Sequence, residues 1–403
     1  MTRQVFILGD QPLPEGSSKP YALLTANPTK EHHYIAQTEQ RQHAHNPQVS
    51  PQNQNVYRLP LSLFGTHPHQ PHDEGKKRKH SAKPAAPPEA ASVNIIGNLA
   101  AKNLYTLAFV ENTGNQYNLE SWFNRHESGY EDACEHLRAL PGCRLKTSEA
   151  SFAKTSEASF AKTSEASFAK TSEASFAKTS KAGLDKTDSV KVPDALWRVL
   201  RLKFLGILRN PRNHQNPFAY RLLQVLRSRL PEAGFEFVSL ISRRDPQRIE
   251  SIMQDFHFSF LGYVNWLSGL YGMLSEGVSQ PSLFERLFCA VFAEPQAVKI
   301  ELFRYPDDTG LCLFGDSGFC IQASSELISI GVNISHDMFA VVHLQAARWH
   351  DFKNTFHHDA PKLQGKVKII DDDQTQRVMF NRLCIRQSHE AVFGRSPNVK
   401  DYI

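Results

Sequence analysis

The chain has 403 residues, a formal net charge of +5 and 40% hydrophobic residues. This length and apolar content suffice for a substantial core, which excludes a wholly disordered chain. The mildly basic balance suits an anionic partner without requiring one.

Cysteine spacing and hydropathy favour a reduced, cytoplasmic protein. The six cysteines contain no C-x-x-C pair, so we expect core thiols and no zinc knuckle: Cys134, Cys143, Cys289, Cys312, Cys320 and Cys384. The apolar stretch near the N-terminus is too short for a secretory signal. The uncharged stretch from Phe256 to Ser275 is long enough for a bilayer, but its polar residues favour a buried helix, so a membrane partner is not expected.

Residues 1–64 form a predicted N-terminal segment that contains His32 and His33. Both histidines precede a stretch of poor helical periodicity, which predicts a loop or a first helical turn. An imidazole can serve as a base or a metal ligand near neutral pH, although a structural role is the alternative. We expect a short strand near Val56, then a flexible linker over 65–92 whose basic run at 76–79 is either a solvated loop or a phosphate contact.

Residues 93–145 are predicted to be helical, with one helix from Asn118 to Pro141 that places Glu127 and Glu131 one turn apart. Residues 146–189 contain four successive copies of TSEASFAK. On a helix, an eight-residue period rotates each phenylalanine by about 80° from the last, so no apolar stripe forms. A tolerated surface insertion is therefore favoured over a binding array.

Residues 190–296 are predicted to form a helical core with a basic stretch. Eight arginines and lysines and no acid lie between Leu196 and Leu230. They either coat the outer face of two helices or bind phosphates. Arg209 and Arg212 flank Pro211 on a turn, which makes them the preferred phosphate ligands.

Short apolar runs with turn signals predict a β-meander over 297–345, followed by a C-terminal loop and helix over 346–403. The acids at 371–373 are predicted to cap that helix, which is expected over 374–393. Asp316, between two runs and beside glycines, is either a turn residue or a group that orients a histidine or binds a cation. The predicted fold class is α+β, mainly helical with a small antiparallel meander in the C-terminal third.

The order of several short motifs resembles the uncharacterised bacterial domain-of-unknown-function 4238 family. His33 and Arg41 match its opening His-x-x-Pro-x-x-x-Leu-Arg pattern, with Ala36 for proline and Gln40 for leucine. Three later motifs follow over about 300 residues: Asn103-Leu104-Tyr105 before a Glu-bearing helix, Arg209-Asn210-Pro211-Arg212, and Asp316 from a Ser-Asp-x-Pro element. The resemblance implies a component of a mobile-element or phage-defence system and assigns no activity.

These residues lead to two functional hypotheses. The first is a metal-assisted phosphodiesterase with His33, Glu127 and Asp316 as catalytic residues and Arg41, Arg209 and Arg212 binding the substrate. A divalent metal ion would be bound by His32, His33 and Asp316. The second is a non-catalytic adaptor that binds nucleic acid or other defence-system proteins through its basic helices.

Overall fold

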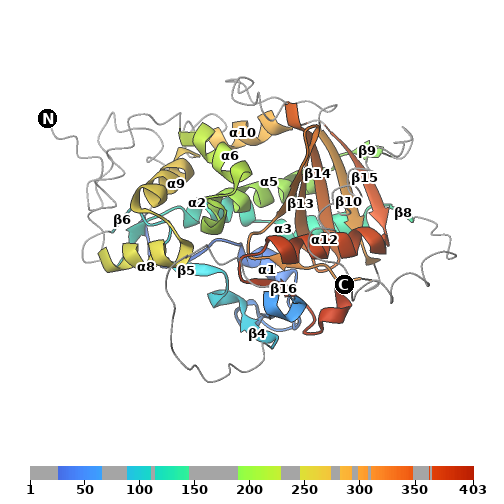
Figure 1. Ribbon diagram of the computed structural model, residues 1–403, viewed down its shortest axis with the longest axis horizontal. Coiled ribbons are helices and arrows are strands. Elements are labelled where there is room, and N and C mark those ends of the chain that lie inside the picture. The colour runs from blue at the N-terminus through green and yellow to red at the C-terminus, as the bar shows by residue number, and fades with distance from the viewer. Residues whose placement is uncertain are drawn as a thin grey trace.

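The computed structural model describes residues 26–65, 89–109, 114–144, 189–227, 246–273, 282–292, 298–306, 310–347, 363 and 365–403 (Figure 1). Its helices are α1 Gln37–Arg41, α2 Glu120–Glu127, α3 Tyr130–Ala139, α5 Asp194–Arg209, α6 Pro217–Arg227, α8 Pro246–Phe256, α9 Phe260–Gly272, α10 Leu283–Val291 and α12 Gln374–Gln387. Short 3-10 turns span Pro51–Asn53, Leu61–Phe64, Ile95–Gly97, Pro211–Asn213 and Val399–Asp401.

A seven-stranded mixed sheet forms the centre of the molecule. Its order is β12-β13-β14-β10-β15-β8, with β9 also paired to β15. The first four strands are antiparallel neighbours, whereas β10 and β8 run parallel to β15. The bounds are β8 Cys143–Arg144, β9 Ser189–Lys191, β10 Val298–Arg304, β12 Cys320–Ala323, β13 Leu327–Ser335, β14 Met338–Gln345 and β15 Lys366–Asp371.

Three smaller sheets bring together segments that are far apart in the sequence. A four-stranded sheet has the order β11-β16-β3-β4, a three-stranded sheet β1-β7-β6, and β2 pairs with β5. The bounds are β1 Ala26–Asn27, β2 Glu31–His33, β3 Asn55–Pro60, β4 Ala91–Asn94, β5 Ala100–Lys102, β6 Ala108–Phe109, β7 Gln116–Tyr117, β11 Phe314–Gly315 and β16 Ala391–Gly394.

The predicted fold class, a mainly helical α+β protein with strands confined to a C-terminal meander, is wrong. Strands begin at Ala26 and recur as far as Gly394, and the meander is one part of a mixed sheet. The two parallel neighbours of β15 are β10 and β8, which lie far apart in the sequence. Pairing between such distant segments leaves no local periodic signal, which is why the sequence did not indicate it.

Two apolar clusters fix the helices to opposite faces of the large sheet. One cluster joins Ile300 and Leu302 to the side chains of α5, α6, α9 and α10, which lie beside the sheet in Figure 1. The other cluster lies under α12, where the Phe380 ring stacks on Phe339 of β14 at 4.2 Å between centroids. The sheet therefore lies between a layer of helices on one face and α12 on the other.

Several local expectations are confirmed. α5 ends at Arg209 before Pro211. Of the three acids expected to cap α12, Asp373 does so by accepting a bond from the Gln376 N–H, whereas Asp371 ends β15 and pairs with Arg304. The stretch after Phe256 contains the buried helix α9, and no helix in the described ranges is both long and apolar enough to cross a bilayer. Five cysteines are free and buried: Cys134, Cys289, Cys312, Cys320 and Cys384.

Other local expectations are wrong. His32 and His33 lie on a strand, because β2 pairs with β5. The last helix ends at Gln387, and the predicted final turn is the strand β16. The TSEASFAK repeats and the basic run at 76–79 lie outside the described residues.

Candidate functional site

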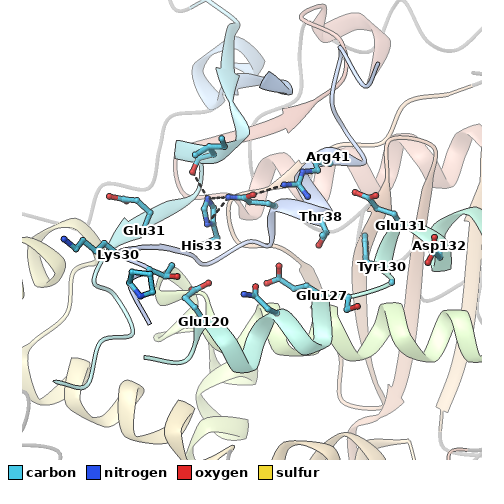
Figure 2. Close-up of a pocket in the computed structure, with 17 residues that line it drawn as sticks. Lys30, Glu31, His33, Thr38, Arg41, Glu120, Glu127, Tyr130, Glu131 and Asp132 are labelled. Atoms are coloured by element: carbon cyan, nitrogen blue, oxygen red, sulfur yellow. Dashed lines mark hydrogen bonds between the residues drawn. The ribbon is translucent and has the colours of Figure 1, made fainter. Parts of the chain in front are cut away.

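A cavity of about 940 Å³ lies between the β2–α1 segment on one side and the α2–α3 pair on the other (Figure 2). We call it the β2–α2 cleft. Its walls contain Pro28, Thr29, Lys30, Glu31, His33, Gln37, Thr38, Arg41, Ile96, Glu120, Asn124, Glu127, Ser128, Gly129, Tyr130, Glu131 and Asp132. Its volume lies toward the upper end of small-molecule sites, which span about 300–1,000 Å³.

His33 is held in one orientation by a chain of hydrogen bonds. Its Nε2–H donates to the Ile96 carbonyl at 2.7 Å, so Nδ1 carries the lone pair. The Gln37 amide nitrogen lies 3.1 Å from Nε2 and 3.5 Å from Nδ1, and the Oε1 atom of Gln37 accepts a bond from Arg41 at 2.9 Å. Burial lowers the pKa of His33, since the charged form loses water. The ring is therefore neutral at pH 7 and offers a basic nitrogen at the cleft.

Glu120 begins α2 and is the most perturbed acid of the cleft. Its residue is 7% exposed, and burial raises its pKa to about 8 despite the nearby Arg209. Its Oε1 atom is buried and has no hydrogen-bond partner within the described part of the chain. Figure 2 shows Glu120 and Glu127 on α2, facing the segment that carries His33. Glu120 is thus a protonated carboxyl at neutral pH that has a bonding position unused.

Glu127 is anchored to a cation below the cleft wall. Its Oε1 atom accepts a bond from Arg209 Nη1 at 2.7 Å, and the Arg209 side chain is fully buried. Burial is the largest influence on the pKa of Arg209 and lowers it, but Glu127 and the weaker contributions of Tyr105, Glu120 and Glu39 together raise that pKa. The guanidinium also lies over the Phe123 ring at 5.0 Å. The pair fixes a negative charge beside the cleft and a positive charge beneath it.

A break between two helices shapes the far end of the cleft. Gly129 has φ of 73°, and a Cβ at this position would lie 2.4 Å from Nη1 of Arg198. A left-handed residue ends the helix predicted over 118–140 after Glu127. Glu131 and Asp132 therefore stand in the first turn of α3 as a second acidic group.

The cleft walls are acidic overall, even with Glu120 counted as neutral. Four acids line the cleft, Glu31, Glu127, Glu131 and Asp132, against the two cations Lys30 and Arg41, and the buried Arg209 beneath the wall offsets Glu127. A polyanion would be repelled by this surplus, whereas a neutral or cationic polar molecule would not. The local charge thus disfavours a phosphodiester backbone as the occupant.

The fold gathers some of the predicted site residues and separates the others. His33, Glu127 and Arg41 line the cleft, and Arg209 contacts it through Glu127. Arg209 lies beneath the wall, where no substrate can reach it. His32, Asp316 and Arg212 do not line the cleft.

His32 has a structural role that uses both ring nitrogens. Its Nδ1 accepts a bond from the Tyr105 N–H at 2.8 Å, and its Nε2 lies 3.2 Å from the Thr29 carbonyl. The ring is fully buried and stacks on Tyr105, whose hydroxyl donates to the Arg209 carbonyl. His32 therefore orders the β2 segment and the end of α5.

Asp316 is a turn residue that anchors the strand β16. Its carboxylate accepts bonds from the backbone N–H groups of His389, Glu390 and Ala391 at 2.7, 2.8 and 3.3 Å. Both oxygens are thereby occupied, and the predicted metal set of His32, His33 and Asp316 does not converge. In the described ranges no three His, Cys, Asp or Glu side chains are grouped as a metal site requires.

Arg212 lines a second cavity of about 470 Å³ together with Tyr34, Arg248 and Phe256. Its Nη2 donates to Glu390 at 2.9 Å, and its guanidinium lies over the Phe256 ring at 5.7 Å. Glu31 lines both cavities, which places them on either side of β2. Arg212 and Arg209 thus serve different parts of the surface although they are three residues apart.

Four of the eight basic side chains between Leu196 and Leu230 form internal ion pairs in the described part of the chain. Lys203 pairs with Glu39 in a buried contact, Arg201 with Glu285 at 3.0 Å, and Arg209 and Arg212 pair as described above. Sequence alone could not show this, because each partner acid comes from a distant segment. These four side chains therefore connect α5 and the turn after it to other segments of the fold.

Replacing Asp316 with alanine is expected to lower the free energy of unfolding by about 3 kcal/mol, because three backbone donors lose a charged acceptor. Urea denaturation of the variant measures the loss. Asp255→Ala removes an exposed acid and is the matched control. A stability change within about 0.5 kcal/mol of wild type, the range of ordinary surface changes, would show that Asp316 is not an anchor.

The sequence interpretation missed Glu120. Its signal was present: Glu120 and Glu127 are seven residues apart, or two turns of one helix, and so share a face. No family model, curated protein or solved structure matches the chain. The resemblance noted above therefore stays a prediction, and the site rests on its own geometry.

Proposed function

We propose that the protein is an enzyme that performs general acid–base chemistry on an uncharged or cationic polar molecule in the β2–α2 cleft. The observation that carries this proposal is the buried, protonated Glu120 carboxyl in the same cleft as a neutral imidazole. Perturbed acids and bases gathered in one cleft are typical of catalytic sites.

In the proposed reaction, Glu120 donates its proton to the leaving group and His33 accepts a proton from the attacking water through Nδ1. The bond to Ile96 fixes the tautomer in which Nδ1 is unprotonated and can accept a proton. Glu127 stabilises developing positive charge, because Arg209 holds its carboxylate in place. Hydrolysis of a neutral glycoside fits these roles, because positive charge develops on the sugar ring as the glycosidic bond breaks.

His33 and Glu127 thus retain the catalytic role expected of them in the predicted nuclease. The predicted metal ligands are not part of this mechanism, because the Asp316 carboxylate already accepts backbone hydrogen bonds. Nucleic acid stays a proposed partner, but at a surface other than this acidic cleft. A place in a bacterial defence or mobile-element system rests on the motif resemblance alone.

A panel of chromogenic substrates tests the reaction: nitrophenyl esters and glycosides, nitroanilide amides and a bis-nitrophenyl phosphodiester. We expect turnover of an uncharged substrate, with a loss of about 10²–10⁴-fold in Glu120→Gln and in His33→Gln. Activity should fall above about pH 8, because Glu120 must be protonated, and fall in acid, where His33 becomes charged.

Glu131→Gln is the matched control, because it removes an exposed acid from the opposite end of the same cleft. No turnover anywhere in the panel, or turnover that both variants retain, would refute the proposed chemistry. Turnover of the phosphodiester alone would favour the nuclease.

A further inference from the structure

A lysine-rich surface occupies part of the sheet face that α12 covers. The strand register sets Lys299 opposite His343, His343 opposite Ser329, and Ser329 opposite Gln322. Directly paired residues point to one face of a sheet, so these four side chains form a row across β10, β14, β13 and β12. Phe339 and Gly331, which the Phe380 ring of α12 contacts, lie farther along the same face.

The same row continues onto the strands beyond β10. Glu301 pairs with Lys368 in the parallel register, and Lys366, two residues earlier, pairs with Lys191 of β9. Residues two apart on a strand share a face, so Lys191, Lys299, Lys366 and Lys368 project together. We call these four residues the lysine face. Neighbouring strands lie about 4.8 Å apart, which places three lysines across roughly 10 Å.

The charge of this face is nearly unopposed. Glu301 is the acid within these rows, and it is already bonded to Lys299 at 2.7 Å and to His343 at 3.3 Å. Although burial opposes it, bonding to His343 and Lys299 lowers the pKa of Glu301 to about 2. Among the acids that the structure describes, none forms an ion pair with Lys191, Lys366 or Lys368. The adjoining helix α12 has three arginines and no acid.

Lysines are common on exposed sheet edges, where they prevent edge-to-edge pairing. That explanation suits Lys191 on β9. It does not suit Lys366 and Lys368, because β15 is an inner strand paired on both sides. Ser329 and His343, bonded at 2.8 Å, add a fixed polar group beside the ammonium groups. Protection of a sheet edge therefore does not explain the lysines on β15.

We propose that the lysine face binds the phosphate backbone of a nucleic acid. Closely spaced ammonium groups complement a chain of phosphates, which carries a charge every few ångströms, and they replace its counterions on binding. The contact is independent of base sequence, because lysines on a flat sheet face reach phosphates only. It does not depend on the chemistry of the β2–α2 cleft.

Fluorescence anisotropy with a labelled DNA duplex and a labelled RNA strand, over a series of salt concentrations, tests the proposal. The full chain should bind, and Lys191→Glu/Lys366→Glu/Lys368→Glu should abolish binding at moderate salt. The milder Lys→Gln triple variant should lower the slope of log affinity against log salt by about one per lysine. The control Lys102→Glu/Arg125→Glu/Lys400→Glu changes the net charge equally at exposed positions away from the face and should bind like wild type.

Failure of wild type to bind, or equal loss in the control variant, would overturn the proposal. Displacement of the nucleic acid by polyglutamate at equal charge concentration would also overturn it and point to an acidic protein. Circular dichroism shows whether the triple variants fold, and the Gln version keeps the test valid if the Glu version does not. Turnover in the chromogenic panel should be the same in the triple variants, so the two proposals fail separately.

Discussion

Replacing Glu127 with glutamine is expected to lower the free energy of unfolding by about 4 kcal/mol. The change leaves the guanidinium of Arg209, which is fully buried, without its carboxylate. Two of its other atoms, Nε and Nη2, are buried and have no partner in the described chain, so no existing bond compensates for the loss. Breaking one side of a buried ion pair costs about 3–5 kcal/mol. Urea denaturation at pH 7 measures this change.

A double-mutant cycle separates the ion pair from the cost of a buried charge. Arg209→Met should destabilise less than Glu127→Gln, because the remaining carboxylate lies on the cleft wall, where water reaches it. The double variant should be more stable than Glu127→Gln alone. The exposed pair of Arg138 and Glu135 is the control, and Glu135→Gln should cost less than about 1 kcal/mol. If the losses of stability in the two single variants add up to the loss in the double variant, Glu127 and Arg209 do not interact as a buried ion pair.

The second large effect is a pH-dependent change in the stability of Glu120→Gln relative to wild type. Folding raises the pKa of Glu120 from 4.5 to about 8, so the folded state holds a proton that the unfolded state releases between these values. Wild type therefore loses stability as pH rises from about 4.5 to 8, and the neutral glutamine does not. The difference should move in favour of the variant by about 4 kcal/mol across this window.

Comparison with the variant isolates Glu120, because both proteins share the opposing titrations of His33 and of His126, whose pKa burial lowers to about 4. Stability of each protein is measured by urea denaturation at several pH values between 4.5 and 8.5. Glu131→Gln is the control, because it also removes one glutamate but at an exposed position. A difference between wild type and Glu120→Gln that stays constant over this range would show that Glu120 ionises as freely in the folded chain as in the unfolded one.

Helical periodicity predicted much of the helical layer, because a buried stripe repeats within a single segment. α5 and α6 begin at Asp194 and Pro217, close to their predicted starts. Strands of two to four residues, such as β4 and β16, are too short to show a period of two. They exist because partners from distant segments pair with them, and such pairing is a property of the whole fold.

The sequence predicted site residues correctly where the polar atoms of the side chain are not already hydrogen-bonded to the backbone. His33 and Glu127 were expected to be functional, and the fold brings both to one cleft. Asp316 and His32 were equally suggestive in sequence, but their polar atoms are taken by backbone groups. Glu120 was overlooked because an acid in the first turn of a helix is usually explained by the helix dipole. Its spacing from Glu127 placed it on the same helix face, but its burial, which raises its pKa, is a property of the fold.

The central claim is that the β2–α2 cleft contains a carboxylic acid that keeps its proton at neutral pH. A carbon-13 NMR titration of glutamate-labelled protein, with the Glu120 signal assigned by its absence in Glu120→Gln, measures this property directly. We expect a midpoint at about pH 8 for that signal. A midpoint at or below pH 5, the range of an ordinary glutamate, would contradict it.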